Sequence, residues 1–140
     1  LRRSGRAVAQ RRLRLPLGAI AQKRALVHGH CHQKAFDALS PTVAMLKLVP
    51  GLAVDVVESS CCGMAGSFGY EAEHHELSMR MAELSLLPAV RAADADPLVV
   101  ADGTSCRHQI ADGTRSVGAG REAVHAIRVL ASALRTAPTP

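Results

Sequence analysis

The residues of this sequence best suited to chemistry are its four cysteines. Each lies just past a short apolar run; the runs and their cysteines are 25–27 with Cys31, 54–57 with Cys61 and Cys62, and 97–100 with Cys106. Helical patterns separate the three runs, which is typical of a parallel α/β sheet. Because the carboxyl ends of parallel strands meet at one edge, we expect the four sulfurs to converge there.

Four converging thiolates predict a metal site, because thiolates are soft ligands that bind iron–sulfur clusters, zinc or copper(I). The adjacent pair Cys61 and Cys62 is unusual for a zinc finger, whose ligands are spaced by two or more residues. Adjacent cysteines suit a multi-iron cluster better, because each sulfur can reach a different iron. Gly63 and Gly66 would let the backbone approach the cluster and direct N–H groups at it. The alternative is that the cysteines are small apolar core residues.

The histidines give a less specific signal than the cysteines. His30 and His32 flank Cys31, and His108 follows Cys106 by two residues, so each could complete the site. Histidines in such places more often make structural hydrogen bonds to the ligands. A disulfide between Cys61 and Cys62 would close a strained ring and make a poor redox pair.

Length and composition predict one domain with a core of small aliphatic side chains. The chain has 140 residues, of which 48% are hydrophobic and 2% aromatic. No apolar run approaches the roughly 20 residues of a membrane span, and no apolar core of a signal peptide is present. We therefore expect a cytoplasmic protein with reduced thiols. Because the first residue is Leu, we also expect the chain to be part of a longer protein.

The positive charge is concentrated in residues 1–24, which hold eight of the 17 basic residues and none of the 12 acidic ones. The rest of the chain is mildly acidic. We expect residues 1–24 to be a basic leader or linker and residues 136–140 to be a disordered tail. The leader lacks the interleaved aromatic residues of a base-stacking surface, so we expect no nucleic-acid partner.

The hydrophobic patterns predict an α/β fold: a small three-layer domain with a parallel sheet flanked by helices and with the cysteines at the C-terminal ends of the strands. Strands are expected at 25–28, 52–57 and 98–101, the second buried on both faces. Helices are expected at 33–49 with a restart at Ser40, at 70–93 with either a kink or the start of a second helix at Pro88, at 106–111 and at 122–134. In the long helix, Leu77, Met81 and Leu84 form the apolar stripe.

Three motifs in order resemble the cysteine-rich CCG domain family; they span residues 30–33 (His-Cys-His-Gln), 61–69 (Cys-Cys-Gly-Met-Ala-Gly-Ser-Phe-Gly) and 103–109 (Gly-Thr-Ser-Cys-Arg-His-Gln). That family occurs in one subunit each of heterodisulfide reductase and anaerobic glycerol-3-phosphate dehydrogenase, and in the iron–sulfur subunit of glycolate oxidase. The motifs look most like the C-terminal region of large bacterial FAD-linked dehydrogenases of D-2-hydroxy acids. The resemblance covers about residues 25–134, so residues 25–135 are expected to form the CCG domain.

The resemblance implies that Cys31, Cys61, Cys62 and Cys106 bind an iron–sulfur cluster, with a four-iron cluster as the expected type and zinc as the alternative. Cofactor-binding residues beside it would be Gly63, Gly66, His30 and His108. The implied role is electron transfer from flavin to an acceptor that the sequence does not identify, for a substrate such as D-lactate, glycolate or D-2-hydroxyglutarate.

The resemblance also implies the surroundings of this region. FAD would lie in the parent protein and not in this chain, which has no catalytic residues and no dehydrogenase activity by itself. Partners would be the flavin and ferredoxin-like domains of the parent, and a partner could hold the protein at a membrane surface. The alternative function is a non-catalytic zinc-binding structural or docking domain.

The sequence departs from the family pattern in two respects. The family's motif ends in Cys-x-x-Cys, whereas here the last position is Gln109, and the chain carries one copy of the motif where well-known members carry two. A cluster held by five cysteines is therefore not expected. A four-thiolate cluster, a zinc site and a site completed by histidine all remain open.

Overall fold

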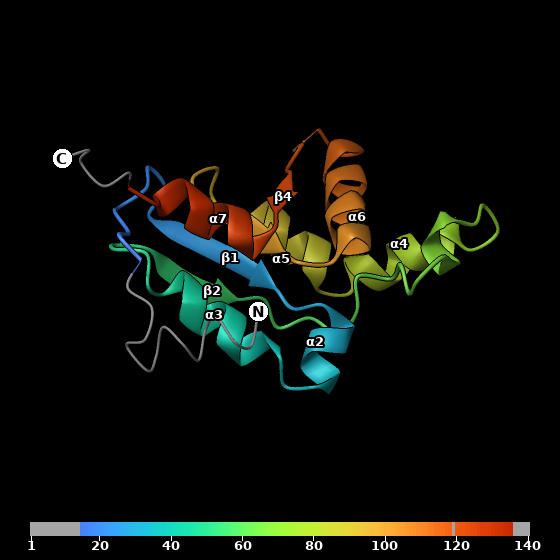
Figure 1. Cartoon of the computed structure of the whole chain (residues 1–140). Coiled ribbons are helices and arrows are strands. Elements are labelled where there is room, and N and C mark those ends of the chain that lie inside the picture. Colours follow the sequence, from blue (N-terminus) through green and yellow to red (C-terminus); the bar gives the residue numbers. More distant parts are fainter. Residues whose placement is uncertain (1–14, 119, 136–140) are drawn as a thin grey trace.

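A four-stranded parallel sheet lies at the centre of the computed structural model, which describes residues 15–118 and 120–135 (Figure 1). Its strands stand in the order β2-β1-β3-β4, and each neighbouring pair is parallel. The strands are β1 (Arg24–His28), β2 (Ala53–Val56), β3 (Leu98–Ala101) and β4 (Ala123–Val124). The predicted α/β class with a parallel sheet is confirmed.

Six α-helices and one 3-10 turn surround the sheet within the described residues. They are α2 (Cys31–Ala35), α3 (Leu39–Leu46), η1 (Phe68–Tyr70), α4 (His75–Glu83), α5 (Leu86–Ala92), α6 (Thr104–Arg115) and α7 (Ala126–Ala133). As Figure 1 shows, α4 and the loop before it extend away from the sheet at the end toward which the strands point.

The helices form a layer on each face of the sheet, which confirms the predicted three layers. Ala25 and Val27 of β1 pack with α3 and α7 in one core cluster. Leu26, between them in sequence, packs with α5 and α6 in a second cluster. This alternation follows from strand geometry, because successive side chains point to opposite faces. Small aliphatic residues fill both clusters, as the low aromatic content predicts.

The chain changes faces at the carboxyl end of β1. Helices α2 and α3 connect β1 to β2, and α4 and α5 connect β2 to β3, which lies on the other side of β1. Of these helices, α3 contributes to one core cluster and α5 to the other. In open α/β sheets, sites form outside the carboxyl ends of the strands at such a switch point. The loops after β1, β2 and β3 carry the four cysteines to this edge.

The orientation of α4 differs from the prediction. Leu77 and Leu84, assigned to the apolar stripe, are 49% and 77% exposed, whereas Ser78 and Ala82 are buried. The reason is the glycine-rich loop, which packs directly on α4: a Cβ added to Gly63 would lie 2.1 Å from the Ser78 carbonyl oxygen. Only a small residue on the helix leaves room for so close a contact.

Several helix boundaries also differ from the sequence expectation. The long helix breaks at Ser85, the N-cap of α5, so Pro88 lies in the first turn of a second helix, which was one of the two outcomes expected at Pro88. Helix α6 continues through Gly113, because the missing side chain there admits Leu87 of α5. Helix α3 begins at Leu39 with Ala38 as its N-cap, not Ser40.

Two strand expectations were wrong. Residues 123–124 form β4 and not the start of the last helix, and β2 is an edge strand with Ala53 and Asp55 exposed. A buried strand and an edge strand of four residues carry similar apolar runs, so only the strand order separates them.

The described part of the predicted leader contacts the domain. Leu17 forms an antiparallel bridge with Leu134, and Leu15, Leu17 and Ile20 pack against the cluster of α3 and α7. Residues 1–14 and the predicted tail, 136–140, lie outside the described residues, and the domain boundaries stay predictions. In the part of the chain that the structure describes, no helix is both long and apolar enough to cross a membrane.

Candidate metal centre

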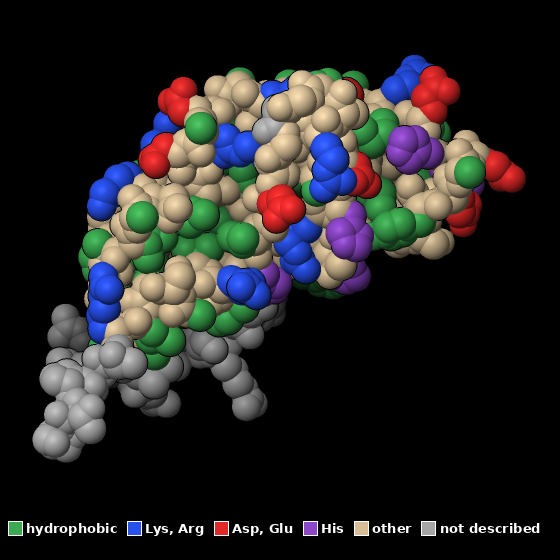
Figure 2. Space-filling model, turned by 90° about the horizontal axis from the view of Figure 1, so that it is seen from above, with side chains coloured by type: hydrophobic (Ala, Val, Ile, Leu, Met, Phe, Trp, Pro, Cys, Tyr) green, Lys and Arg blue, Asp and Glu red, His purple; other side chains and the backbone are tan. Residues whose placement is uncertain are grey.

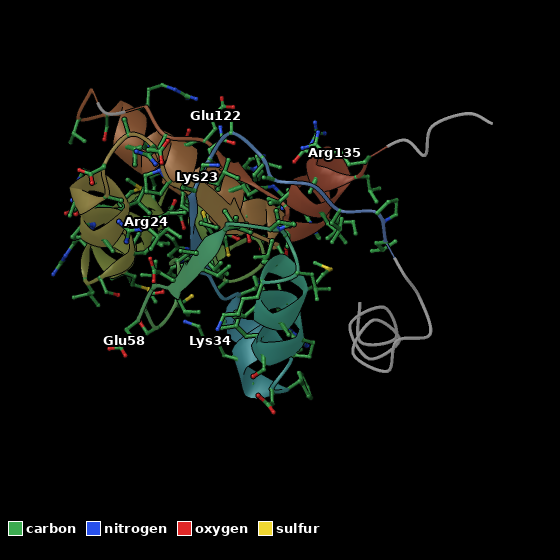
Figure 3. The ribbon with its side chains drawn as sticks, turned by 90° about the vertical axis from the view of Figure 1, so that its left-hand side faces the viewer. Lys23, Arg24, Lys34, Glu58, Glu122 and Arg135 are labelled. Carbon is green, nitrogen blue, oxygen red and sulfur yellow. The ribbon has the colours of Figure 1, made fainter. Side chains whose placement is uncertain are left out.

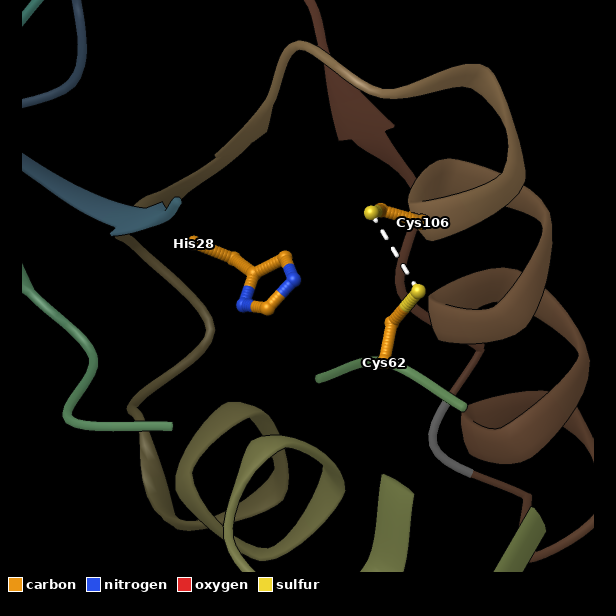
Figure 4. A group of neighbouring side chains, drawn as sticks. All are labelled: His28, Cys62 and Cys106. Carbon is orange, nitrogen blue, oxygen red and sulfur yellow. Dashed lines mark hydrogen bonds between the residues drawn. The ribbon is translucent and has the colours of Figure 1, made fainter. Parts of the chain in front are cut away.

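A buried group of two cysteines and one histidine lies at the switch point of the sheet (Figure 4). His28 ends β1, Cys62 follows β2, and Cys106 lies in the first turn of α6, after β3. Their ligand atoms all lie within 4.8 Å of one another. The three residues are 1%, 4% and 1% exposed, so solvent is excluded from the group.

Strand and loop geometry explain how the three side chains meet. His28 lies two residues after Leu26, so its side chain points to the same face of the sheet, the one that α5 and α6 cover. Gly103 precedes α6, and a Cβ there would lie 2.9 Å from Cys106 Sγ and 2.5 Å from the ring of His30. A glycine at 103 therefore leaves the space in which the Cys106 sulfur faces the other ligands.

The two buried sulfurs interact directly. Cys106 Sγ donates to Cys62 Sγ across 3.3 Å. This hydrogen bond lowers the pKa of Cys62 to about 4 against the opposing effect of burial, and His28 and the Met64 N–H lower it further. The same contact, together with burial, raises the pKa of Cys106. One sulfur of the pair is thus a thiolate at neutral pH, which is the form that binds metals.

The donor set fits a metal ion. Nδ1 of His28 lies 2.8 Å from Ser59 Oγ, whereas Nε2 is buried and has no hydrogen-bond partner of ordinary geometry among the described residues. An unpaired buried polar atom costs about 1–3 kcal/mol. Two sulfurs and an imidazole nitrogen are ligands that zinc and iron accept, and a metal ion between them would satisfy Nε2.

Cys31 and Cys61 lie at the same edge but nearer the surface. Cys31 is exposed and Cys61 is partly buried. The Cys61 sulfur accepts a hydrogen bond from the Gly63 N–H at 3.3 Å. Burial raises the pKa of Cys61, and the nearby Cys62 and Cys31 sulfurs raise it further, while the Gly63 N–H acts in the opposite direction. The structure therefore brings all four cysteines to one edge, as an inner pair and an outer pair.

The two histidines predicted to bind the cofactor make other contacts. His30 is the N-cap of α2, where its Nδ1 accepts from the His32 N–H at 3.1 Å, and its ring lies beside Gly103. His108 Nδ1 lies 2.7 Å from the Tyr70 hydroxyl. Neither His30 nor His108 belongs to the buried group of His28, Cys62 and Cys106. The role of these histidines at a cofactor stays a prediction.

The predicted glycines have distinct surroundings. Gly63 has a φ of 91° and packs on Ser78, and its N–H donates to the Cys61 sulfur. Gly66 has a φ of 70° but no atom lies within 4 Å of the position of a Cβ. Gly63 thus contacts the site, and Gly66 shapes the turn.

Sequence reasoning placed His28 at the end of the first strand but named only His30, His32 and His108 as histidines of the site, and it did not single out Ser59. The signal for His28 is strand alternation, because as the last residue of β1 it shares a face with Leu26. For Ser59 the sequence offers no comparable signal, since its contact with His28 joins residues 31 positions apart.

Gln109 occupies the position at which the family motif places a further cysteine. It is 3% exposed, and its Nε2 donates to Ser78 Oγ at 2.9 Å. Ser78 Oγ in turn lies 3.7 Å from Met64 Sδ. Gln109 therefore joins α6 to α4 and to the glycine-rich loop, a structural role that a thiol could not fill as well.

A surface groove of about 530 Å³ lies beside α2, α3 and the edge strand β2. It is lined by Lys34, Asp37, Leu39, Ser40, Val43, Ala44, Lys47 and Val56. None of the four cysteines lines it, so the groove and the buried group are separate features.

Comparison with curated proteins finds similarity to parts of two oxidoreductases. The C subunit of anaerobic glycerol-3-phosphate dehydrogenase from Escherichia coli (strain K12) is 32% identical over 120 residues, which cover 86% of this chain and 28% of that protein. D-2-hydroxyglutarate dehydrogenase of Escherichia coli (strain K12) is 31% identical over 96 residues, covering 68% of this chain and 9% of that protein. The chain thus spans less than a third of these relatives. No family model and no solved structure matches the chain.

Proposed function

We propose that this chain is a metal-binding redox module of the CCG type within a flavin-linked dehydrogenase of a small hydroxylated substrate, such as a D-2-hydroxy acid. The observation that carries the proposal is the buried group of His28, Cys62 and Cys106 at the switch point of the sheet. The similarity to regions of two dehydrogenases supports the same function.

In this proposal the four thiols have two tasks. Cys62 and Cys106 hold the centre from inside, where the low pKa of Cys62 keeps a thiolate ready for the metal. Cys61 and Cys31 approach it from the surface, where the Gly63 N–H donates to the Cys61 sulfur. An iron–sulfur cluster held by these residues would exchange single electrons, and hydrogen bonds to its sulfurs would tune its potential. Flavin and substrate would bind elsewhere in the parent protein.

A specific observation supports the second candidate, a structural zinc site. Two thiolates on one tetrahedral zinc lie about 3.8 Å apart, given Zn–S bonds of about 2.3 Å. Cys62 Sγ and Cys106 Sγ are separated by 3.3 Å, close to that spacing. Thiolates on different irons of a cluster lie farther apart, since the spacing between the irons adds to the separation.

Metal analysis of the 140-residue chain separates the two candidates. Protein prepared without oxygen is assayed for iron, acid-labile sulfide and zinc, in the wild type and in the variants Cys61→Ser and Cys62→Ser. A cluster requires both cysteines, so each variant should lose the visible absorbance and the electron paramagnetic resonance signal of the reduced centre. A zinc site should lose its metal in Cys62→Ser and keep it in Cys61→Ser.

The matched control is Ser60→Ala, which changes the exposed neighbour of the cysteine pair and should change neither the iron content nor the zinc content. Tight zinc binding with no uptake of iron and sulfide would overturn the redox function. Absence of both metals from the wild type would overturn the metal centre itself.

A further inference from the structure

The ring of His28 is fixed at one nitrogen only. Its Nδ1 lies 2.8 Å from Ser59 Oγ, and its side chain is buried. In Figure 4 the other side of the ring faces Cys62 and Cys106. The contact with Ser59 therefore sets the direction in which Nε2 points.

Ser59 is itself held in place by the chain around it. Lys34 of α2 donates to the carbonyl oxygens of Ser59 and Ser60, the latter at 3.3 Å. The Ser59 N–H donates to the Val57 carbonyl at 2.9 Å. Figure 3 shows Lys34 between its helix and the loop that follows β2. Ser59 therefore links α2 to His28: Lys34 of α2 holds its backbone, and its hydroxyl contacts the ring of His28.

A hydroxyl group differs from a carboxylate or an amine because it can both donate and accept. If Nδ1 carries the proton, it donates to Ser59 Oγ, and Nε2 presents a lone pair to a metal. If Nε2 carries the proton, it can donate to the Cys62 thiolate, while Ser59 donates to Nδ1. The ligand nitrogen of His28 lies within 4.8 Å of the Cys62 sulfur.

We propose that Ser59 is a positioning residue for His28, and that its hydroxyl lets the ring change tautomer when a metal binds. In the metal-free protein the proton lies on Nε2, which faces the sulfurs of Cys62 and Cys106. On metal binding Nε2 gives up its proton and Nδ1 takes one up, so the ring stays neutral while the Cys106 thiol releases its proton to solvent. The inference rests on the proposed metal centre.

Residues that orient a metal-binding histidine through its second nitrogen affect metal affinity by about 10- to 100-fold. Ser59→Ala removes the partner of Nδ1 and should weaken zinc binding by about that factor. Ser59→Asp provides an acceptor only, which fixes the proton on Nδ1, so zinc should bind at least as tightly as in the wild type. A role of Ser59 in the fold alone would give losses in both variants.

The experiment uses the reduced, metal-free 140-residue chain labelled with ¹⁵N in histidine. Ring ¹⁵N shifts report the tautomer of His28 before and after zinc, and competition with a chromophoric chelator gives the zinc affinity. The wild type should change tautomer on zinc binding, whereas Ser59→Asp should hold the proton on Nδ1 in both states. Lys34→Met should weaken zinc binding less than Ser59→Ala does, because it loosens Ser59 without removing the hydroxyl.

Ser60→Ala and Ser60→Asp are the matched controls, since they repeat each change one residue away and should leave the tautomer and the affinity as in the wild type. If Ser59→Ala binds zinc as tightly as the wild type with the same ring tautomer, the inference about Ser59 is wrong and the metal centre stands. If the wild type binds no zinc, the metal centre is wrong and this inference with it. Equal gains in zinc affinity for Ser59→Asp and Ser60→Asp would overturn the tautomer mechanism, because the added charge alone would explain them.

Discussion

Gln33 Nε2 donates to Asp102 Oδ2 at 2.7 Å, which joins α2 to the end of β3. The same side chain accepts from the His30 N–H at 3.0 Å through its Oε1. Asp102 also accepts from the Ala126 N–H at 3.0 Å, at the start of α7. One partly buried carboxylate, whose side chain is 10% exposed, therefore holds the segment of Cys31 beside the segment of Cys106.

Asp102→Ala should lower the free energy of unfolding by about 2–4 kcal/mol, because it removes charge-assisted hydrogen bonds to two elements. It should also weaken metal binding, since the loop with Cys31 loses its support. Chemical denaturation of the metal-free chain measures the first effect and a zinc titration the second. Asp112→Ala, on an exposed ion pair with Arg115, is the control and should change stability by less than about 0.5 kcal/mol. Equal stability of the two variants would refute the role of Asp102.

Gly63→Ala should destabilise the domain far more than Gly66→Ala. Both positions have positive φ, which costs an L-residue about 1–2 kcal/mol. Only at Gly63 does the added Cβ also meet a neighbour, the Ser78 carbonyl oxygen at 2.1 Å. We expect about 3 kcal/mol or more for Gly63→Ala and about 1–2 kcal/mol for Gly66→Ala. Urea denaturation measures both, and similar values would contradict the packing of the loop on α4.

The sequence predicts the sheet, the layers and the edge where the cysteines lie, because these depend on local patterns. Short, continuous apolar runs mark β1 and β3, and the fixed handedness of connections between parallel strands leaves few topologies. The convergence of the cysteines then follows from the geometry of parallel strands.

The contacts inside the site could not be predicted in the same way. Cys62 and Cys106 meet across 44 residues, and their 3.3 Å contact depends on the exact path of two loops. The apolar stripe of Leu77 and Leu84 predicts a buried face that the structure leaves exposed, because the packing of Gly63 and Gly69 on Ser78 determines how α4 is turned. Tertiary packing here overrides the helical pattern.

The surface shows why one net charge describes the chain poorly. Figure 2 shows basic and acidic side chains interspersed over the face in view, with histidines toward the end that carries α4. The arginine-rich residues 1–14, which hold much of the excess positive charge, lie outside the described residues. Partners should therefore be sought through the site and not through net charge.

Two truncations test where the domain begins. Removal of residues 1–14 should change the thermal midpoint by a few degrees at most, because their charge is lopsided and their apolar pattern is weak. Removal of residues 1–22 also deletes Leu15, Leu17 and Ile20, which pack against the cluster of α3 and α7. That loss should lower the free energy of unfolding by about 2–4 kcal/mol. Thermal and urea unfolding measure both, and equal stability of the two truncations would show that residues 15–20 contribute nothing.

The last prediction concerns the protonation of the inner cysteine pair. Because its pKa is lowered to about 4, Cys62 should be a thiolate in the metal-free chain at pH 6, where ordinary thiols with a pKa of about 8.5 are protonated. Thiolate absorbance at 240 nm should therefore persist at pH 6 and disappear as the pH falls through about 4. Cys106→Ala removes the thiol that donates to Cys62, so the pKa of Cys62 should rise and the absorbance at pH 6 should fall. Cys31→Ala, which changes an exposed cysteine, should leave the thiolate absorbance at pH 6 unchanged. Absorbance at pH 6 that is unaffected by Cys106→Ala would show that the contact between the two sulfurs does not hold the charge.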